Sequence, residues 1–324
     1  MFEKAQIGKF WMYGPCGLLE DSTQPSGLSD KIGDTFIELF YNTDQWKETI
    51  SVIDGYGYWA WILNYRSDEE LRVCFENMNR LGIPLGLEIG GIKKNAASVR
   101  ELFDENTRMI DRFISLGANI VQIALDEPLV SVVHIDGGRN FDYIGDTGAK
   151  FEFAVENTAE YIRMLKEYYP NVAVGDIEVF PAFDTDFDIK WINALEKRLR
   201  QKGVPGQDFF RLDVHWTGFE DRGYSSDEGW TEVLKIEKHC RSIGLPFSFI
   251  YWAPNAENPE KYRQSLWYEG VMRQAEAYKK AGGCPDQYVV ESWIRGIPEK
   301  LIPETDEWTY TKSVLDVYNR YVKQ

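Results

Sequence analysis

The sequence is poor in basic residues, and this shortage restricts the ligands that the protein can bind. Its 324 residues include 36 Lys and Arg against 52 Asp and Glu, a formal net charge of −16. A protein that binds nucleic acid neutralises phosphates with a basic surface, so we expect no nucleic-acid partner. The acidic surplus instead directs attention to chemistry carried by carboxylates.

Cysteine, histidine and long hydrophobic runs are also scarce. The four cysteines form no C-x-x-C pair, so we expect neither a disulfide scaffold nor a zinc site. No segment reaches 18 uninterrupted apolar residues, and the first ten residues lack the apolar core of a signal peptide. We therefore predict a soluble protein without a membrane partner, either cytoplasmic or secreted after removal of a leader; the sequence predicts no oligomeric state.

Apolar residues are abundant, at 44% of the chain, and they follow a regular pattern. Short apolar runs alternate with longer segments of helical period, which is typical of successive βα units and a parallel sheet. Glycines follow the helical segments, as in Leu81-Gly82, and predict left-handed helix ends. The eight predicted strands are 8–14, 57–62, 84–90, 119–125, 172–180, 209–216, 246–253 and 287–293.

Eight such units without a linker predict a single α/β domain, a (β/α)8 TIM barrel over residues 1–324. An open doubly wound sheet is the alternative, but no G-x-G-x-x-G follows the first predicted strand. Long segments follow three predicted strands, at 14–42, 127–153 and 217–229. We expect these loops to shape a site on the catalytic face of the barrel.

Carboxylates recur at the ends of five predicted strands. They are Glu88, Asp126 with Glu127, Asp176 with Glu178, Asp213, and Glu291. Each one alone is explained equally well by an ion pair or a helix cap, because buried carboxylates need such partners. Their recurrence at the strand ends predicts an active site there, since barrel enzymes take their catalytic residues from these positions.

The stretch Asp126-Glu127-Pro128 resembles the Asn-Glu-Pro motif of a large clan of retaining (β/α)8 glycoside hydrolases. The resemblance implies that Glu127 is the general acid/base. Asp126 stands where the clan has an Asn that holds the sugar 2-hydroxyl, so we expect it to contact substrate. The clan also has a nucleophilic Glu at the end of the seventh strand, whereas residues 249–255 contain no carboxylate.

Two further stretches resemble poorly characterised bacterial barrel proteins described as glycosidase-like. They are Val174-Gly175-Asp176-Ile177-Glu178 and Glu291-Ser292-Trp293, which join with residues 213–216 to extend the resemblance to the C-terminus. Gln often stands at the position of Glu291 in those proteins, which implies a substrate contact for this residue.

Glycoside hydrolysis also needs an ionised carboxylate opposite the acid. It acts as a nucleophile at about 5 Å from the acid, or as a base for water at about 6.5 to 9.5 Å. Glu178 is our first candidate, because its strand adjoins that of Glu127. Asp213 lies one strand farther away and suits an inverting separation; the sequence leaves both open.

Aromatic residues and one histidine complete the predicted substrate-binding set. Ring faces pack against the C–H faces of sugars, and His215 can hydrogen-bond a hydroxyl or ligate a metal. With Glu88, Asp126 and Glu291, the predicted contacts are Trp61, His215, Trp216, Tyr251, Trp252 and Trp293.

We therefore predict a glycoside hydrolase that acts on an oligosaccharide or glycoconjugate, without a cofactor or bound metal. The first alternative is a divalent-metal sugar isomerase or epimerase. Its ligands would be Glu178, Asp213, His215 and Glu291. The second is a carbohydrate-binding barrel without catalytic activity, suggested by the missing carboxylate on the seventh strand. Neither G-x-S-x-G nor G-x-x-x-x-G-K occurs, which disfavours serine hydrolases and phosphate-loop enzymes.

Overall fold

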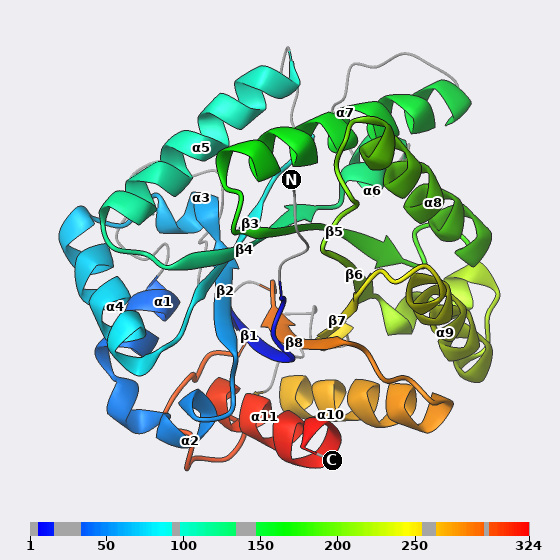
Figure 1. Ribbon diagram of the computed structural model, residues 1–324. Coiled ribbons are helices and arrows are strands. Elements are labelled where there is room, and N and C mark those ends of the chain that lie inside the picture. The colour runs from blue at the N-terminus through cyan, green and yellow to red at the C-terminus, as the bar shows by residue number, and fades with distance from the viewer. Residues whose placement is uncertain are drawn as a thin grey trace, which may run out of the picture. The chain divides into compact units, whose positions relative to one another are not determined.

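Eight parallel strands form a closed barrel in chain order, surrounded by helices (Figure 1). The computed structural model describes residues 6–15, 34–92, 98–133, 147–254, 264–294 and 298–323. The strands are β1 (Phe10–Pro15), β2 (Gly55–Trp59), β3 (Leu85–Ile89), β4 (Ile120–Asp126), β5 (Ala173–Phe180), β6 (Phe209–Val214), β7 (Phe247–Tyr251) and β8 (Gln287–Ser292). The predicted (β/α)8 barrel is confirmed, and the open-sheet alternative is wrong.

The helices begin and end at the signals present in the sequence. Ser67 and Glu70 form the capping box of α4, and Gly82 ends that helix with a left-handed φ of 71°. The long helices are α4 (Asp68–Leu81), α5 (Val99–Ser115), α7 (Thr147–Tyr168), α8 (Thr185–Gln201), α9 (Ser226–Ser242) and α10 (Gln264–Ala281). The shorter ones are α1 (Asp34–Tyr41), α2 (Lys47–Ile50), α3 (Ala60–Leu63), α6 (Pro128–Val133) and α11 (Tyr310–Val317).

Several loop elements differ from the sequence prediction. The second strand ends at Trp59, and α3 follows at once, so Trp61 lies on a helix. The predicted loop 217–229 contains the single turns η2 (Trp216–Gly218) and η3 (Glu220–Arg222) before α9. Parts of the other two predicted loops, residues 16–33 and 134–146, lie outside the described residues.

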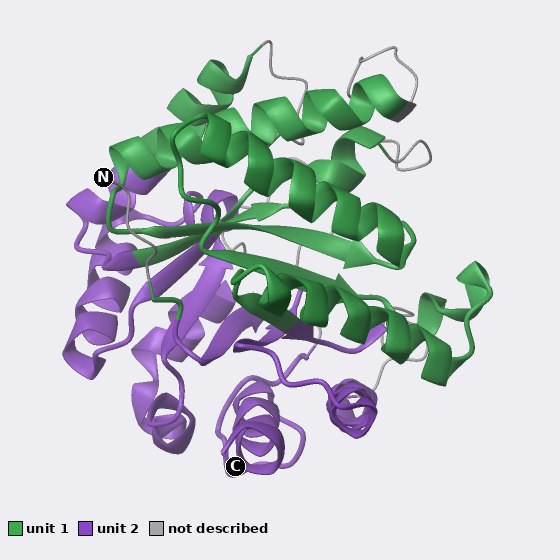
Figure 2. Cartoon of the chain, turned by 45° about the vertical axis from the view of Figure 1, so that its right-hand side comes forward, with its two compact units in different colours: residues 1–7, 88–108, 121–249 green, residues 8–87, 109–120, 250–324 purple. Residues whose placement is uncertain are grey.

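The chain divides into two compact units (Figure 2). Unit 1 comprises residues 1–7, 88–108 and 121–249, and unit 2 comprises residues 8–87, 109–120 and 250–324. The assignment of residues 1–324 to one domain stays a prediction.

Large aromatic rings on β1 pack against glycines on β2 within unit 2. A Cβ atom built on Gly55 would lie 2.5 Å from the Trp11 ring, and one on Gly57 would lie 2.1 Å from Tyr13. Any side chain at these glycines would therefore collide with the rings. The same strand face continues from Gly57 to Trp59, because residues two apart share a face.

The register within unit 1 sorts the carboxylates of three strands onto two faces. Asp126 of β4 is paired with Ile177 of β5, and Asp213 of β6 is paired with Val179. Residues paired across a parallel sheet share a face, and successive residues alternate. Asp126 and Asp213 therefore lie on one face of this wall, while Asp176 and Glu178 lie on the other.

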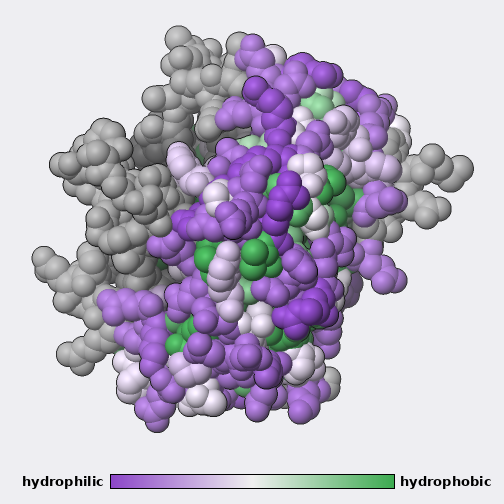
Figure 3. Space-filling model, turned by 90° about the vertical axis from the view of Figure 1, so that its left-hand side faces the viewer, coloured by the Kyte–Doolittle hydropathy of each residue, from purple (hydrophilic) through white to green (hydrophobic). Residues whose placement is uncertain are grey.

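Hydrophilic residues predominate on the described surface in Figure 3, where the hydrophobic patches are small and separate. Among the described residues, no helix has the length and apolar character needed to cross a membrane.

Candidate active site

A buried arginine identifies the inner face of the unit 1 wall. Arg211 of β6 donates to Gln122 of β4 at 2.6 Å and to Ser248 of β7 at 3.0 Å. The bond from β6 to β4 spans the intervening strand β5. On the opposite face, the Asp176 carboxylate accepts a hydrogen bond from Trp191 of α8 at 2.7 Å. This bond shows that the opposite face packs against α8.

Asp126 and Asp213 share the inner face with Arg211 and stand at the ends of their strands. Asp213 is 7% exposed and Asp126 is half-buried. Glu88, at the end of β3, is also buried. His215 follows β6, is half-buried, and donates its backbone N–H to the Phe180 carbonyl at 2.8 Å. Trp216 begins η2 directly after it and is half-buried.

Glu127 is held in a backbone conformation that few non-glycine residues adopt. Its φ is 47°, in the left-handed region. Its N–H donates to the Ile177 carbonyl at 2.9 Å, and its own carbonyl accepts from the Ser131 N–H at 3.0 Å. Pro128 then occupies the first position of α6, where a proline costs no hydrogen bond. Contacts to β5 and α6 thus fix the backbone of Glu127, whose side chain is half-buried, directly after the end of β4.

Glu178 lies on the outer face, and its carboxylate caps α6. It accepts from the backbone N–H of Leu129 at 2.5 Å and of Val130 at 3.2 Å, and it is 1% exposed. Burial, followed by the negative charges of Asp176 and Glu127, raises the pKa of Glu178 well above its usual value. The structure therefore brings Glu178 near Glu127, but on the face opposite to Asp126 and Asp213.

Two further buried acids lie between β5 and α8. Burial raises the pKa of Asp176 to about 7. Burial also raises the pKa of Asp188, in the first turn of α8, well above its usual value, and the charges of Asp184 and Asp176 add to this effect. Neither carboxylate oxygen of Asp188 has a hydrogen-bond partner among the described residues. These surroundings favour the protonated form of both acids.

Unit 2 contains most of the predicted aromatic contacts and one acid. Glu291 is buried on β8, two residues after Val289, which pairs with Trp11. Trp252 and Trp293 are in contact, with ring centroids 4.5 Å apart. Trp252 is buried, whereas Trp293 is 38% exposed.

Tyr251 does not join these rings. It is buried and stacks on Tyr288 with centroids 5.9 Å apart and planes 11° from parallel. Tyr251 thus has the surroundings of a core residue.

Trp61 has an exposed aromatic neighbour that the sequence analysis missed. Trp61 and Tyr65 are 42% and 57% exposed, and their rings meet edge to face at 6.3 Å. Arg112 of α5 donates to the carbonyls of Asn64 and Arg66 and so fixes the backbone on both sides of Tyr65. The signal for Tyr65 was its position four residues after Trp61, which is the spacing of helix neighbours.

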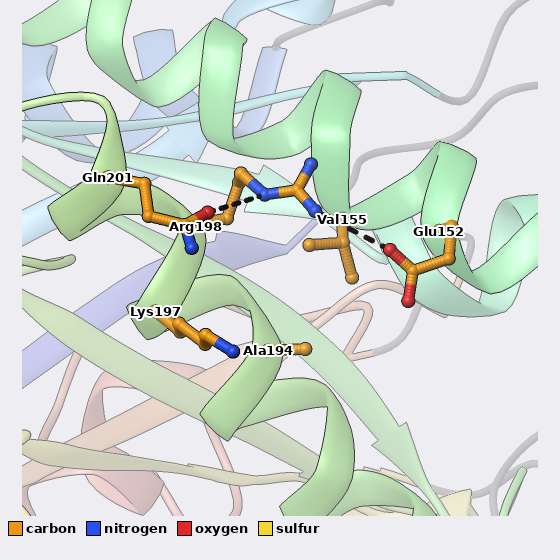
Figure 4. A pocket seen from close by; sticks show the side chains of 6 residues that line it. All are labelled: Glu152, Val155, Ala194, Lys197, Arg198 and Gln201. Atoms are coloured by element: carbon orange, nitrogen blue, oxygen red, sulfur yellow. Dashed lines mark hydrogen bonds and ion pairs between the residues drawn. The ribbon is translucent and has the colours of Figure 1, made fainter.

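A hollow of about 230 Å³ lies elsewhere in unit 1, between α7 and α8 (Figure 4). Arg198 crosses it, bonded to Gln201 at 3.1 Å and to Glu152 at 3.5 Å. It lies on the outer helices and includes none of the predicted site residues. In the part of the chain that the structure describes, no group of three or more His, Cys, Asp or Glu side chains is arranged to hold a metal.

The barrel is similar to several solved enzymes of low sequence identity. An endo-β-1,4-mannanase of family GH26 from Bacillus sp. JAMB-750 matches with a TM-score of 0.53 and 15% identity, over 96% of this chain and 85% of that one. A beta-glucosidase from Exiguobacterium marinum matches with a TM-score of 0.51 and 14% identity, over 98% of both chains.

A D-psicose 3-epimerase from Clostridium cellulolyticum H10 matches with a TM-score of 0.50 and 13% identity, over 96% of this chain and 97% of that one. No family model matches the chain, and no curated protein matches it. The likeness is one of fold. It supports the resemblance to barrel glycoside hydrolases in fold, and the same fold is found in the epimerase.

Proposed function

We propose that the protein is a glycoside hydrolase in which Glu127 is the general acid/base. The observation that carries the proposal is the backbone of Glu127, held in the left-handed region at the end of β4 by bonds to β5 and α6. Strained residues that their surroundings hold in place are frequent at active sites. A half-buried acid at the carboxyl end of a barrel strand can protonate a leaving glycosidic oxygen.

Asp213 is the partner that the wall of unit 1 supports best. It shares the inner face with Asp126, with β5 between their two strands, and it is largely buried. Glu178 is on the outer face and caps α6, so its role in this proposal is to anchor the backbone next to Glu127. Glu88, Asp126 and His215 would then hydrogen-bond sugar hydroxyls.

The aromatic contacts proposed for the sugar are Trp61, Trp216, Trp252 and Trp293, and Glu291 is proposed as a polar contact. Trp61 and Trp293 support this role best, because each exposes a large ring that another ring braces. The buried stacking of Tyr251 on Tyr288 supports a core role for Tyr251, so we no longer include it.

The test is hydrolysis of a panel of aryl glycosides and oligosaccharides by the wild type and by Glu127→Gln. Loss of a general acid typically lowers kcat by about 10² to 10⁴-fold. Wild-type activity in Glu127→Gln would refute the proposal. Each assay is repeated after EDTA treatment and after Mn²⁺ addition, because loss with the chelator and recovery with the metal would favour the metal-dependent alternative instead.

A second measurement separates the acid/base from its partner. In Glu127→Ala, added azide should restore turnover of an activated aryl glycoside and give a glycosyl azide. A product of retained anomeric configuration identifies Glu127 as the acid/base, and a product of inverted configuration would identify Glu127 as the nucleophile. Absence of turnover by the wild type on every substrate, with glycan binding retained, would favour the catalytically inactive carbohydrate-binding barrel.

A further inference from the structure

Within unit 2, the register between β1 and β8 shifts directly opposite Glu291. The residue pairs on either side of the shift are Met12 with Val290 and Pro15 with Ser292. Two residues of β1, Tyr13 and Gly14, therefore face the single residue Glu291 of β8. β-Bulges are rare between parallel strands, and they often lie beside active sites, where they change the direction of a side chain.

A buried tyrosine at the start of α11 bridges the two strands at this bulge. The Tyr310 hydroxyl donates to the Val290 carbonyl of β8 at 2.9 Å and to the Tyr13 carbonyl of β1. The Tyr310 side chain is fully buried, and its ring packs against Trp267 of α10 with centroids 5.3 Å apart. One hydroxyl thus contacts both strands, and on β8 it contacts the residue that immediately precedes Glu291.

The position of Tyr310 is fixed by its own backbone and by its neighbours in the chain. Its backbone N–H donates to the Lys300 carbonyl at 3.0 Å. Thr309 is the N-cap of α11, and the Thr311 hydroxyl donates to the Leu301 carbonyl at 2.7 Å. The first turn of α11 is therefore anchored to residues 300–301, which keeps the phenol in place at the bulge.

Tyr310 and Glu291 also interact through charge. Burial, followed by the negative charge of Glu291, raises the pKa of Tyr310 well above its usual value. The phenol therefore keeps its proton at neutral pH and remains a hydrogen-bond donor to the two strands.

We propose that Tyr310 is a positioning residue that holds the β1–β8 bulge in the shape that directs the Glu291 carboxylate to a sugar hydroxyl. This inference rests on the proposed function, in which Glu291 is a polar contact of the substrate. Hydrogen bonds weaken steeply when they are misaligned, so an acceptor on a fixed backbone binds a hydroxyl more tightly than one on a loose backbone. Because Tyr310 is fully buried, it acts on the substrate through Glu291.

The first measurement tests whether Tyr310 restrains β8, and it does not depend on turnover. Hydrogen–deuterium exchange of the backbone amides of residues 287–292 is followed by mass spectrometry in the wild type and in Tyr310→Phe. Loss of one buried hydrogen-bond donor should speed this exchange by about 3- to 10-fold. Unchanged exchange in Tyr310→Phe would overturn the proposal.

The matched control is Tyr268→Phe, which removes another phenol that bonds to α11. The Tyr268 hydroxyl donates to Asp316, six residues after Tyr310, at 2.7 Å. This variant should lower the melting temperature without speeding exchange at residues 287–292. Equally faster exchange in both variants would indicate a general loosening of the helices and would count against the proposal.

A second variant covers the case in which Tyr310→Phe does not fold. Thr311→Val removes the bond to the Leu301 carbonyl and keeps the Tyr310 hydroxyl. It should speed exchange at residues 287–292 in the same direction, and unchanged exchange would contradict the proposal.

The second measurement tests whether Tyr310 acts through Glu291. Tyr310→Phe should raise KM for an oligosaccharide by about 3- to 10-fold and change kcat by less than about 2-fold, because it displaces a binding contact and leaves the acid/base in place. Glu291→Gln should also raise KM, and Tyr310→Phe added to it should raise KM no further. Additive effects of the two substitutions on KM would overturn the proposal.

Together, the two measurements distinguish this inference from the proposed function. If Tyr310→Phe speeds the exchange but the wild type hydrolyses no glycoside, the proposed function fails and the restraint of β8 by Tyr310 stands. If the wild type is active but the KM effects add, the positioning role fails and the proposed function stands.

Discussion

The inner and outer faces of the wall formed by β4, β5 and β6 carry the same kind of residue in opposite surroundings. Asp126 and Asp213 stand on the inner face with Arg211, at the end of the barrel where substrates enter such folds. Asp176 and Glu178 stand on the outer face, bonded to a helix tryptophan and to helix amides. A carboxylate at a strand end therefore indicates a catalytic role only when its side chain also lies on the inner face of the sheet.

The largest expected effect is a difference in kcat between variants of Asp213 and of Glu178. Asp213→Asn should lower kcat by about 10² to 10⁴-fold, because it removes the ionised partner of the acid. Glu178→Gln keeps an acceptor for the α6 amides and should lower kcat less than about 10-fold. Steady-state kinetics on the best aryl glycoside gives both values. Equal losses in the two variants would break the distinction between the faces and restore Glu178 as the catalytic partner.

The next effect concerns stability and the outer acid Asp176. Its pKa is raised from 3.8 to about 7 in the folded protein, so the folded state binds the proton more tightly than the unfolded chain. Stability from this group is therefore fully present below about pH 4 and is lost as the pH rises towards 7. Asp176→Asn should abolish this loss and stabilise the protein at pH 8 by up to about 4 kcal/mol, with little change at pH 4.

Urea unfolding at both pH values measures this difference. The matched control is Asp186→Asn, an exposed position on α8, which should change stability by less than about 0.5 kcal/mol. A destabilised Asp176→Asn at pH 8 would mean that burial does not raise the pKa of Asp176 in the folded protein.

The smallest effect extends the comparison of faces to the aromatic residues of unit 2. Trp293→Ala should raise KM for an oligosaccharide about 5-fold with little change in kcat, because a ring contact contributes roughly 1 kcal/mol. Tyr251→Phe keeps the stacking on Tyr288 and should leave KM unchanged. A KM effect from Tyr251→Phe would show that its hydroxyl reaches the substrate.

An exposed tryptophan away from the strand ends serves as a control for the KM effect of Trp61. Trp308 is 43% exposed and Trp61 is 42% exposed, so their exposure is matched. Trp61→Ala should raise KM and Trp308→Ala should not. Similar values for the two would assign the Trp61 effect to general surface hydrophobicity.

The fold was predictable because each βα unit carries its own local signals. Apolar runs, the Ser67 capping box and the helix-ending glycines all act over a few residues, and the structure contains each of them. The end of β2 was misplaced by three residues, because residues 60–62 are apolar and suit a strand as well as the short helix α3. Local patterns do not separate those two outcomes.

The residues near the site could be predicted from the sequence, but the face of the sheet on which each side chain lies could not. Asp176 and Glu178 alternate with apolar residues in β5, but strands of a parallel barrel are buried on both faces, so this alternation does not say which face is the outer one. Its partner, α6, has only six residues and falls within a predicted loop. The buried hydrogen bond of Arg211 could not be predicted, because Arg211 belongs to no motif and its partner Gln122 lies 89 residues earlier.

Trp11 and Tyr13 pack against Gly55 and Gly57, so substitutions on β1 and β2 should depend on one another in evolution. A methyl group at Gly57 has no room while Tyr13 is present, so position 57 can gain a side chain only if position 13 has a smaller one. Natural relatives should therefore change both positions together, with a small residue at 13 wherever 57 bears a side chain. Gly57→Ala combined with Tyr13→Ala would open space between β1 and β2 and offer a starting point for a larger ligand.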